Sequence, residues 1–390
     1  MDYPADWKIK KLGDCVTENL SYGINAPAIP YSINEPKYIR ITDITEDGKY
    51  NDTDIKSVAH PNCERYSLHY GDIVMARTGA SVGKSYCYDI RDGKLVYAGY
   101  LIKASVDCDK FDPRYIAAQL KTPRYWSWVI SMSMRSGQPG INSQEYSSFL
   151  IPIPPFAEQK AIADTLGTFD AHIKNLSELI EKKKAIRDGA LEDLMSGKIR
   201  LKGFSGDWAV KKLGGEYSII MGQSPSSSSY NQDKKGLPLI QGNADIKNGI
   251  IFTERYTSQP TKICEANTTI LSVRAPVGTV NQSDQKVCLG RGVCAIIGEI
   301  SNFIYYLMKY NEKSWKKLEQ GSTFTAVSRK VINDFEIFIP KDKTEQQAIA
   351  ETLTAFDNEI KALEAERDKI IQIRNGAMDD LLTGKVRLKF

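Results

Sequence analysis

The sequence has no long apolar run, few histidines and an odd number of cysteines, and each shortage excludes a class of protein. No segment approaches the roughly 18 apolar residues that a membrane span needs, and the N-terminus has no secretory apolar core, so we expect a cytoplasmic protein. The seven cysteines include no CxxC pair, which argues against a disulfide framework and a zinc site; we interpret them as reduced, mostly buried thiols. His60, His69 and His172 are too scattered to hold a metal, and structural roles are expected for them.

Catalytic motifs are missing as well. No HExxH, GxSxG or zinc-deaminase pattern occurs. The segment from Gly79 to Ser85 resembles a phosphate-binding loop, but three residues separate its glycines where four are required. The segment from Ile153 to Phe156 resembles the Pro-Pro-aromatic motif of amino methyltransferases, yet isoleucine cannot accept a hydrogen bond from a target amino group, so it fits the start of a helix better. We therefore predict no catalysis by this chain alone, no metal site and no bound cofactor.

The sequence does contain a long internal repeat. Shifted by 187 positions, residues 158–202 match residues 345–389 at 24 of 45 positions. A second match aligns Trp7 to Gly13 (WKIKKLG) with Trp208 to Gly214 (WAVKKLG) at five of seven positions. The stretches between these anchors are hardly similar. One chain thus holds two copies of a preserved frame and two divergent inserts, which suggests two related recognition tasks held at a fixed separation.

The preserved frame has the periodicity of long helices. The stretches after Pro155 and Pro340 lack proline and place apolar residues alternately four and three positions apart, which is typical of a seam that packs against one other helix. The seam residues are Ile162, Leu166, Phe169, Ile173, Leu176 and Ile180 in the first copy, and Ile349, Leu353, Phe356, Ile360 and Leu363 in the second, where the seam skips Arg367 and resumes at Ile370, Ala377 and Leu381. Gly197 and Gly384 are predicted C-caps, each followed by a short basic, strand-like tail. About 40 residues at 1.5 Å per residue predict helices roughly 60 Å long.

Two further pairs of matching residues favour a helix pair over ordinary core packing. Gly189 and Gly376 lie inside otherwise strong helices, where glycine costs about 1 kcal/mol relative to alanine. Close approach of another backbone would explain them. Arg187 and Arg374 occupy seam positions, where a cation must reach solvent or meet an acid such as Asp188.

The divergent inserts, residues 14–154 and 215–340, hold short β-rich runs broken by turn residues. Shorter helices are expected around Pro113 to Lys121 and Ser301 to Lys317. We predict an α+β fold, with two mixed α/β globules joined by two long antiparallel helices that form a coiled-coil pair with a pseudo-two-fold internal repeat. The predicted domains are residues 1–155 and 201–343 for the globules, 156–200 for the first long helix with its linker, and 344–390 for the second long helix.

Short motifs before both long helices and within the first globule are distinctive. They are IPIP with Glu158-Gln159, IP with Glu345-Gln346, GDIV leading to Gly79 and Gly83-Lys84, and Ser136-Gly137-Gln138. No single motif is specific, but their duplicated arrangement resembles the DNA specificity subunit of type I restriction-modification enzymes over essentially the whole chain. This resemblance implies two target recognition domains that each read half of a split DNA site, and helices that dock two methyltransferase subunits. The second globule departs from the pattern, because RAPVGT lacks the Gly-Lys step and GSTF replaces SGQPG.

The resemblance also implies where the chemistry resides. S-adenosylmethionine, ATP and Mg are expected only on partner subunits, which comprise the two methyltransferase subunits and the restriction subunits. Lys182 to Lys184 could belong to the docking surface, although a lysine run is usually a solvated face. Two alternatives stay open: a specificity subunit of a bifunctional nuclease-methyltransferase system, and a two-headed scaffold that does not bind DNA. The net charge of +4 permits a polyanion partner without demanding one.

DNA reading requires cationic and amide side chains on loops, because phosphate contacts fix position while base edges supply the code. A local ion pair, such as one between Arg40 and Asp43, is the alternative role for each candidate. The candidates are Tyr22, Tyr31, Arg40, Arg77, Lys84, Arg135, Gln138 and Asn142 in the first globule, and Gln223, Tyr230, Gln241, Asn243, Arg274, Arg291, Arg329 and Lys330 in the second. If the helix pair is rigid, the spacer between the half-sites should be constant.

Overall fold

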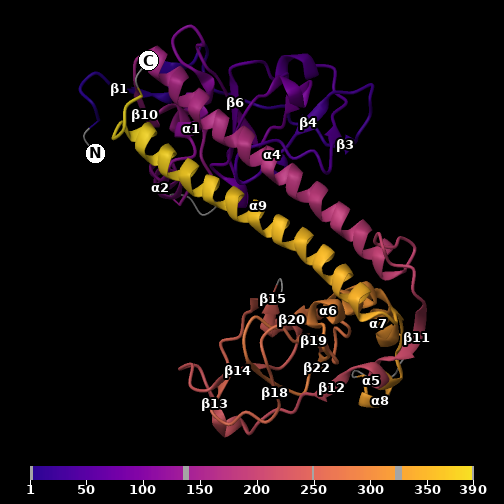
Figure 1. Ribbon diagram of the computed structural model, residues 1–390. Helices are drawn as coiled ribbons and strands as arrows, with labels where there is room; N and C mark the ends of the chain where they lie inside the picture. The colour runs from indigo at the N-terminus through magenta and orange to yellow at the C-terminus, as the bar shows by residue number, and fades with distance from the viewer. Residues whose placement is uncertain (1–2, 135–139, 248–249, 321–326, 389–390) are drawn as a thin grey trace. The chain divides into compact units, whose positions relative to one another are not determined.

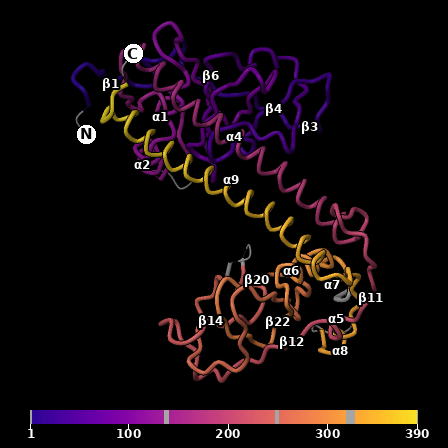
Figure 2. Tube along the Cα trace, in the orientation of Figure 1, coloured from indigo at the N-terminus to yellow at the C-terminus, as the bar shows by residue number. Residues whose placement is uncertain are grey.

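The computed structural model describes residues 3–134, 140–247, 250–320 and 327–388 (Figure 1). It divides into two compact units, Met1–Asn175 with Glu366–Phe390, and Leu176–Ala365. The long helices α4 (Phe156–Met195) and α9 (Lys343–Thr383) each contribute one part to each unit, as the chain path in Figure 2 shows. We call the two parts unit 1 and unit 2.

Unit 1 contains two four-stranded sheets. The first is antiparallel, in the order β2 (Ser21–Tyr22), β9 (Leu101–Ser105), β6 (Asp72–Ala76) and β7 (Ser85–Cys87). The second has the order β3 (Ile29–Pro30), β5 (Lys56–Ser57), β4 (Lys37–Ile39) and β8 (Leu95–Tyr97), with β4 and β8 parallel. The remaining elements are a ribbon of β1 (Lys8–Lys11) and β10 (Leu150–Ile153), and the helices α1 (Pro113–Gln119), α2 (Pro123–Ser133) and α3 (Ser143–Ser147).

Strand β6 explains how the core of unit 1 is layered. All five of its residues are buried, because successive side chains of a strand point to opposite faces and both faces are covered. Ile73 and Met75 pack into the cluster that also contains residues of α1, α2 and both long helices. Val74 and Ala76 pack instead into the cluster formed with β4, β8 and β9.

Unit 2 repeats the strand order of unit 1, with β18 added to its second sheet, although the sequences are hardly similar. Its first sheet runs β12 (Ser218–Met221), β22 (Val293–Ile297), β19 (Thr269–Ser272) and β20 (Val280–Gln282). Its second runs β13 (Tyr230–Asn231), β17 (Tyr256–Thr257), β14 (Leu237–Ile240), β21 (Val287–Leu289) and β18 (Ile263–Cys264), with β14 and β21 parallel. The other elements are β11 (Trp208–Lys212), β15 (Ile246–Lys247), β16 (Ile250–Ile251), β23 (Glu336–Pro340), α5 (Leu213–Glu216), α6 (Ser301–Tyr310), α7 (Glu312–Gln320) and α8 (Arg329–Asp334).

The predicted pairing of the long helices is confirmed inside each unit. In unit 1 Arg374 Nε lies 3.1 Å from Asp170 Oδ1, and in unit 2 Arg187 Nη1 lies 2.6 Å from Asp357 Oδ1. The two pairs are related by the repeat, and they require antiparallel helices. Asp188 also accepts a bond from Arg187, as predicted, whereas the partner on the other helix could not be seen in the sequence.

In each unit, an ion pair of a buried glutamate beside a tryptophan ring joins the preserved motifs. In unit 2 Arg200 makes a bidentate pair with Glu345, which is 1% exposed, and lies over the Trp208 ring. Arg387, Glu158 and Trp7 repeat this arrangement in unit 1. The adjacent glutamines are also buried, and each donates a hydrogen bond to a proline carbonyl shortly before its helix, Gln159 to Pro154 and Gln346 to Pro340.

The cysteines and the capping glycines are as predicted, whereas the tail after the first long helix is not. The seven cysteines are unpaired, and five are buried. Gly197 and Gly384 have φ angles of 71° and 72° just after the helices end, which confirms them as C-caps. The expected strand-like tail is wrong, because residues 198–202 follow turns without pairing to a strand.

The expected close approach at the helix glycines is also wrong within the chain. A Cβ added at Gly189 or Gly376 would meet no atom of the described residues within 4 Å, apart from its own helical turn.

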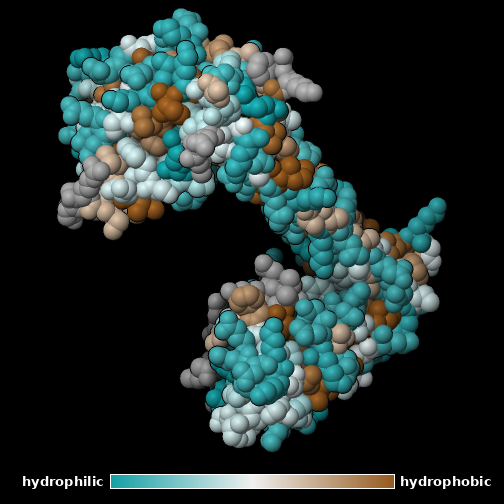
Figure 3. Space-filling view, turned by 90° about the vertical axis from the view of Figure 1, so that its left-hand side faces the viewer, coloured by the Kyte–Doolittle hydropathy of each residue, from teal (hydrophilic) through white to brown (hydrophobic). Residues whose placement is uncertain are grey.

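Two lysines of the Lys182–Lys184 run form ion pairs with the other long helix. Lys183 Nζ lies 2.6 Å from Glu359 Oε1, and Lys184 Nζ lies 3.0 Å from Glu364 Oε1. Hydrophilic residues cover most of the face drawn in Figure 3, and hydrophobic residues form small patches there. None of the described helices combines the length and apolar character needed to cross a bilayer.

Candidate DNA interface

Three of the candidate segments of unit 1 meet where β2 and β6 of its antiparallel sheet end. The Arg77 guanidinium carbon lies 4.7 Å from the centroid of the Tyr22 ring. The Tyr22 hydroxyl accepts a hydrogen bond of 3.1 Å from the Ser143 backbone N–H, next to the candidate Asn142. Burial alone would raise the pKa of Tyr22, but this hydrogen bond and the nearby Arg77 charge outweigh it, so the pKa lies below its usual value.

The turn between β8 and β9 contributes a residue that the sequence analysis missed. Tyr100 is 61% exposed, and its carbonyl accepts a hydrogen bond of 3.0 Å from the Arg77 N–H. The break in the β-rich run LVYAGYLIKAS at Gly99-Tyr100 was the signal that could have identified it. Asn142 is exposed and caps α3 by accepting a hydrogen bond from the Glu145 N–H.

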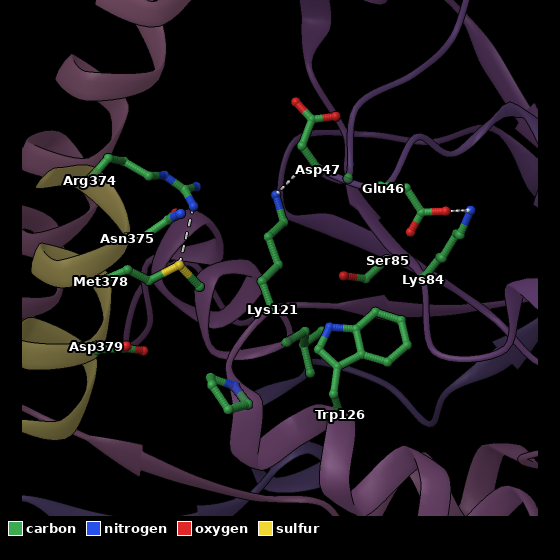
Figure 4. Close-up of a pocket in the computed structure, with 13 residues that line it drawn as sticks. Glu46, Asp47, Lys84, Ser85, Lys121, Trp126, Arg374, Asn375, Met378 and Asp379 are labelled. Carbon is green, nitrogen blue, oxygen red and sulfur yellow. Dashed lines mark hydrogen bonds and ion pairs between the residues drawn. The ribbon is translucent and has the colours of Figure 1, made fainter. Parts of the chain in front are cut away.

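Arg40 and Lys84 are held by acids of their own unit. Asp43 binds the Arg40 guanidinium through both carboxylate oxygens, at 2.8 and 2.7 Å, which is the local alternative considered for this residue. Lys84 Nζ lies 2.6 Å from Glu46, in a cleft of about 320 Å³ beside α9 (Figure 4). These two cations are therefore already neutralised by carboxylates.

The same cleft holds a half-buried lysine. Lys121 Nζ donates a hydrogen bond to the Asp47 carbonyl at 2.7 Å (Figure 4). Burial lowers the pKa of Lys121, and the Arg374 charge lowers it further. Of the other candidates, Tyr31 is 52% exposed on the early loop, whereas Arg135 and Gln138 lie outside the described residues.

Four candidates of unit 2 lie beside both of its sheets, with Tyr230 in β13 and Gln241 after β14 of the second sheet, and Gln223 after β12 of the first. Gln241 donates a hydrogen bond to the Tyr230 hydroxyl at 3.1 Å. The N–H of Arg291 donates to Ser224 Oγ at 3.2 Å, which places Arg291 beside the loop that begins at Gln223. Arg291 and Gln223 are both exposed.

Glycines bring these loops close to one another in both units. Gly23 and Gly222 follow equivalent strands, and their N–H groups donate to Leu101 and Val293 at 3.1 and 3.0 Å. A Cβ at Gly23 would lie 2.2 Å from the Ala98 carbonyl oxygen, and one at Gly222 would lie 2.0 Å from that of Gly290. The two units thus present different side chains on one backbone arrangement.

The remaining candidates of unit 2 lie elsewhere. Asn243 lines a cleft of about 850 Å³ with Arg187 and Tyr306, whose hydroxyl donates to Asp357 at 2.7 Å. Four helix residues of this cleft, Arg187, Asp188, Leu191 and Glu192, are the repeat equivalents of Arg374, Asn375, Met378 and Asp379 in the unit 1 cleft. Arg274 is exposed after β19, and Arg329 and Lys330 are exposed at the start of α8.

The described residues show no sign of a catalytic or metal centre. No group of three or more histidine, cysteine or acidic side chains could hold a metal ion in this part of the chain. The segment that resembles a phosphate-binding loop leads into β7, which starts at Ser85, rather than into the helix that such a loop needs. The cationic, amide and aromatic side chains on these loops have the chemistry of a binding surface.

Comparisons with known proteins agree with this interpretation. The family model described as type I restriction modification DNA specificity domain matches residues 4–184 and 205–372. The chain is similar to a putative type I restriction enzyme MjaX specificity subunit of Methanocaldococcus jannaschii, at 31% identity over 413 residues, covering 100% of this chain and 95% of the relative. It is also similar to the EcoKI specificity subunit of Escherichia coli, at 27% identity over 244 residues, covering 55% of this chain and 49% of the relative.

Solved structures share the fold. A type I restriction-modification S subunit from M. genitalium matches with a TM-score of 0.64 at 17% identity, over 98% of each chain. The HsdS subunit from Thermoanaerobacter tengcongensis matches with a TM-score of 0.50 at 20% identity, over 99% of each chain. Since the family model covers most of its length and a relative matches all of it, the chain belongs to the family of type I restriction-modification DNA specificity subunits.

Proposed function

We propose that this specificity subunit reads a split DNA sequence, with one half-site contacted by the cluster at Tyr22, Arg77, Tyr100 and Asn142 and the other by the cluster at Gln223, Gln241 and Arg291. The observation that carries the proposal is that the two units share one arrangement of strands, while the loops beside their sheets bear unlike polar side chains. Equal backbones with unequal side chains are what two related but different readings require. The subunit is not a catalyst, and a bifunctional system or a non-DNA scaffold is not favoured by its family.

Each cluster combines side chains suited to base edges. Arginine can bond the O6 and N7 acceptors of guanine, and glutamine or asparagine can match adenine. Tyrosines beside them can stack or contact phosphates. In unit 2, Tyr230 holds the amide of Gln241, which would leave the Gln241 carbonyl oxygen as the group that accepts from a base. Arg40 and Lys84 are weaker candidates because acids already bind them.

The separation of the half-sites would be set by the two long helices. Each of them continues without interruption from one unit into the other, and each is paired with the other helix within both units. Forty residues at 1.5 Å per residue span roughly 60 Å, or at most about 18 base pairs at 3.4 Å per pair. Half-site centres about one helical turn of DNA apart fit inside this length.

Two methyltransferase subunits would dock on the outer faces of these helices, one for each unit. Ile186 is 55% exposed and its repeat equivalent Ile373 is 45% exposed, so each unit offers the same apolar position. The exposed Gly189 and Gly376 lie three residues further along, where an outside helix could approach closely. A surface that occurs twice suits a partner that binds twice.

The reaction chemistry would belong to the partners. S-adenosylmethionine would be bound by the methyltransferase subunits, and ATP and Mg by the restriction subunits. The complex would act in the cytoplasm, where its DNA lies. These subunits and the DNA complete the set of partners that we propose.

The methylated motif in cells tests this function. Cells that carry the chain with the methyltransferase subunits of its own system should show methylation at one split sequence with a constant gap, measured by sequencing of modified DNA. Cells with the methyltransferase subunits alone serve as the control. A continuous motif, or a gap that varies among sites, would contradict the proposal.

A further inference from the structure

The cations on the loops of unit 1 are not equivalent, because acids neutralise some of them and not others. Arg40 is bound by Asp43 and Lys84 by Glu46. No carboxylate of the described residues lies within ion-pair distance of the Arg77 guanidinium. Among the candidate cations that the structure describes in unit 1, Arg77 thus keeps its charge available for a ligand.

The backbone of Arg77 is fixed from both sides. Its N–H donates to the Tyr100 carbonyl at 3.0 Å, and its carbonyl accepts from the Ile141 N–H at 2.9 Å. The guanidinium then lies over the ring of Tyr22, at 4.7 Å from guanidinium carbon to ring centroid. An aromatic face attracts a guanidinium through its quadrupole and favours a defined orientation of the planar group.

Tyr22 is itself held in place at both ends. Its backbone pairs with Ile102 in the sheet, and its hydroxyl accepts from the Ser143 N–H at 3.1 Å at the start of α3. Because Arg77 already covers the ring, the ring is poorly placed to stack on a DNA base. This arrangement differs from the role of a direct stacking or phosphate contact that the sequence suggested for Tyr22.

We infer that Tyr22 is a positioning residue, which holds the Arg77 guanidinium so that it reads a guanine in the half-site of unit 1. This inference rests on the proposed function. A fixed guanidinium plane is needed for two parallel hydrogen bonds to guanine O6 and N7, whereas a phosphate contact tolerates many orientations. The chemistry of the ligand is therefore a guanine edge in the major groove.

The test compares variants of the full chain, each produced with its methyltransferase subunits, by sequencing the DNA methylated in cells. The readout is the preference for guanine over the other bases at each position of the motif. Arg77→Ala should abolish the preference for one guanine of one half-site. Arg77→Lys keeps the charge but not the bidentate geometry, and should reduce that preference roughly ten-fold or more.

Tyr22→Leu should weaken the preference at the same position, whereas Tyr22→Phe keeps the ring and should retain most of it. Once Arg77 is replaced by alanine, adding Tyr22→Leu should change nothing further at that base. Tyr70→Leu is the matched control, since Tyr70 is 68% exposed and belongs to no candidate cluster. The other half-site should stay unchanged in every variant, which also shows that the variants fold.

Distinct outcomes would overturn the inference. A uniform loss of methylation in Arg77→Lys and Arg77→Ala, without loss of base preference, would indicate a phosphate contact. An effect of Tyr22→Leu that persists in the absence of Arg77 would indicate a merely structural tyrosine. A failure of Tyr22→Phe to retain the preference would exclude the ring as the holding group. Absence of any split motif with the unaltered chain would instead defeat the proposed function.

Discussion

The two acids of the Glu-Gln motifs stabilise the junctions between strands and helices because each is buried against an arginine. Glu345 is 1% exposed, and Arg200 reaches it from the segment that follows α4, with Nη2 at 2.7 Å from Oε2. A buried carboxylate that loses its cation destabilises the fold by far more free energy than an exposed carboxylate does, because water does not solvate the buried charge. Both copies of the repeat contain this arginine, glutamate and tryptophan at equivalent positions.

Arg200→Ala should therefore destabilise unit 2 by about 3 kcal/mol, at the low end for a broken buried pair because Arg200 is partly exposed. Lys341→Ala is the control, as its pair with Asp207 is exposed on both sides and should contribute less than about 1 kcal/mol. Hydrogen exchange of unit 2 amides measures the change locally, since two units need not unfold together. Adding Glu345→Gln to Arg200→Ala should recover part of the loss; equal effects of Arg200→Ala and Lys341→Ala would contradict this account.

At the scale of elements, the spacing of apolar residues predicted the two long helices, because a helical seam is a pattern among residues that lie near one another in the sequence. The seam residues Leu166 and Leu353 are buried as predicted. The β-rich runs also became strands, for example GDIV at β6. The equivalence of the two sheet orders could not be predicted, because it depends on long-range pairing and the inserts share too few residues.

The site was predictable only in part, for the same physical reason. Residue type and loop location identified Tyr22 and Arg77 as candidates, but not their mutual contact, since 55 positions separate them in the sequence. Lys84 is a candidate because it is a cation on a loop, but no pattern in the sequence indicates that Glu46 binds it. Tyr100 was missed because its neighbours suggested a strand.

The helix glycines give a prediction for the long helices. Gly189→Ala and Gly376→Ala should each stabilise the free chain by about 1 kcal/mol, because both glycines are exposed inside helices and an added Cβ meets no described atom nearby. The same changes should weaken assembly with the methyltransferase subunits if an outside backbone approaches there. Thermal unfolding measures the first effect, and titration calorimetry with the partner measures the second.

Gly167→Ala is the matched control for these helices. Gly167 is also exposed in α4 with no atom near an added Cβ, but its repeat equivalent is Thr354, so this position tolerates a side chain. The Gly167→Ala substitution should stabilise the free chain without weakening assembly with the methyltransferase subunits. Unchanged assembly in all three variants would mean that Gly189 and Gly376 are not kept for a partner.

At the scale of the whole molecule, a fixed spacer requires that both long helices keep their pairing when their length changes. The ion pairs Asp170–Arg374 and Arg187–Asp357 are equivalent in the repeat. Insertions must therefore be made at equivalent points of both helices if both pairs are to be kept. Seven residues preserve the alternation of the seam, whereas other lengths rotate one part of the seam away from its partner. Equivalent insertion points are after Glu178 in α4 and after Ala365 in α9.

Inserting one heptad at both points should lengthen the preferred gap by about three base pairs, because seven residues add roughly 10 Å along a helix and each base pair occupies 3.4 Å. Both half-sites should keep their sequences, since no residue of either cluster changes. Sequencing of the methylated DNA measures gap and half-sites together. A chain with the heptad in α4 alone is the control. It should lose methylation, because the apolar seam of the longer α4 can no longer pair with that of α9 in both units. A doubly lengthened chain that still methylates the original gap would show that something other than these helices sets the distance.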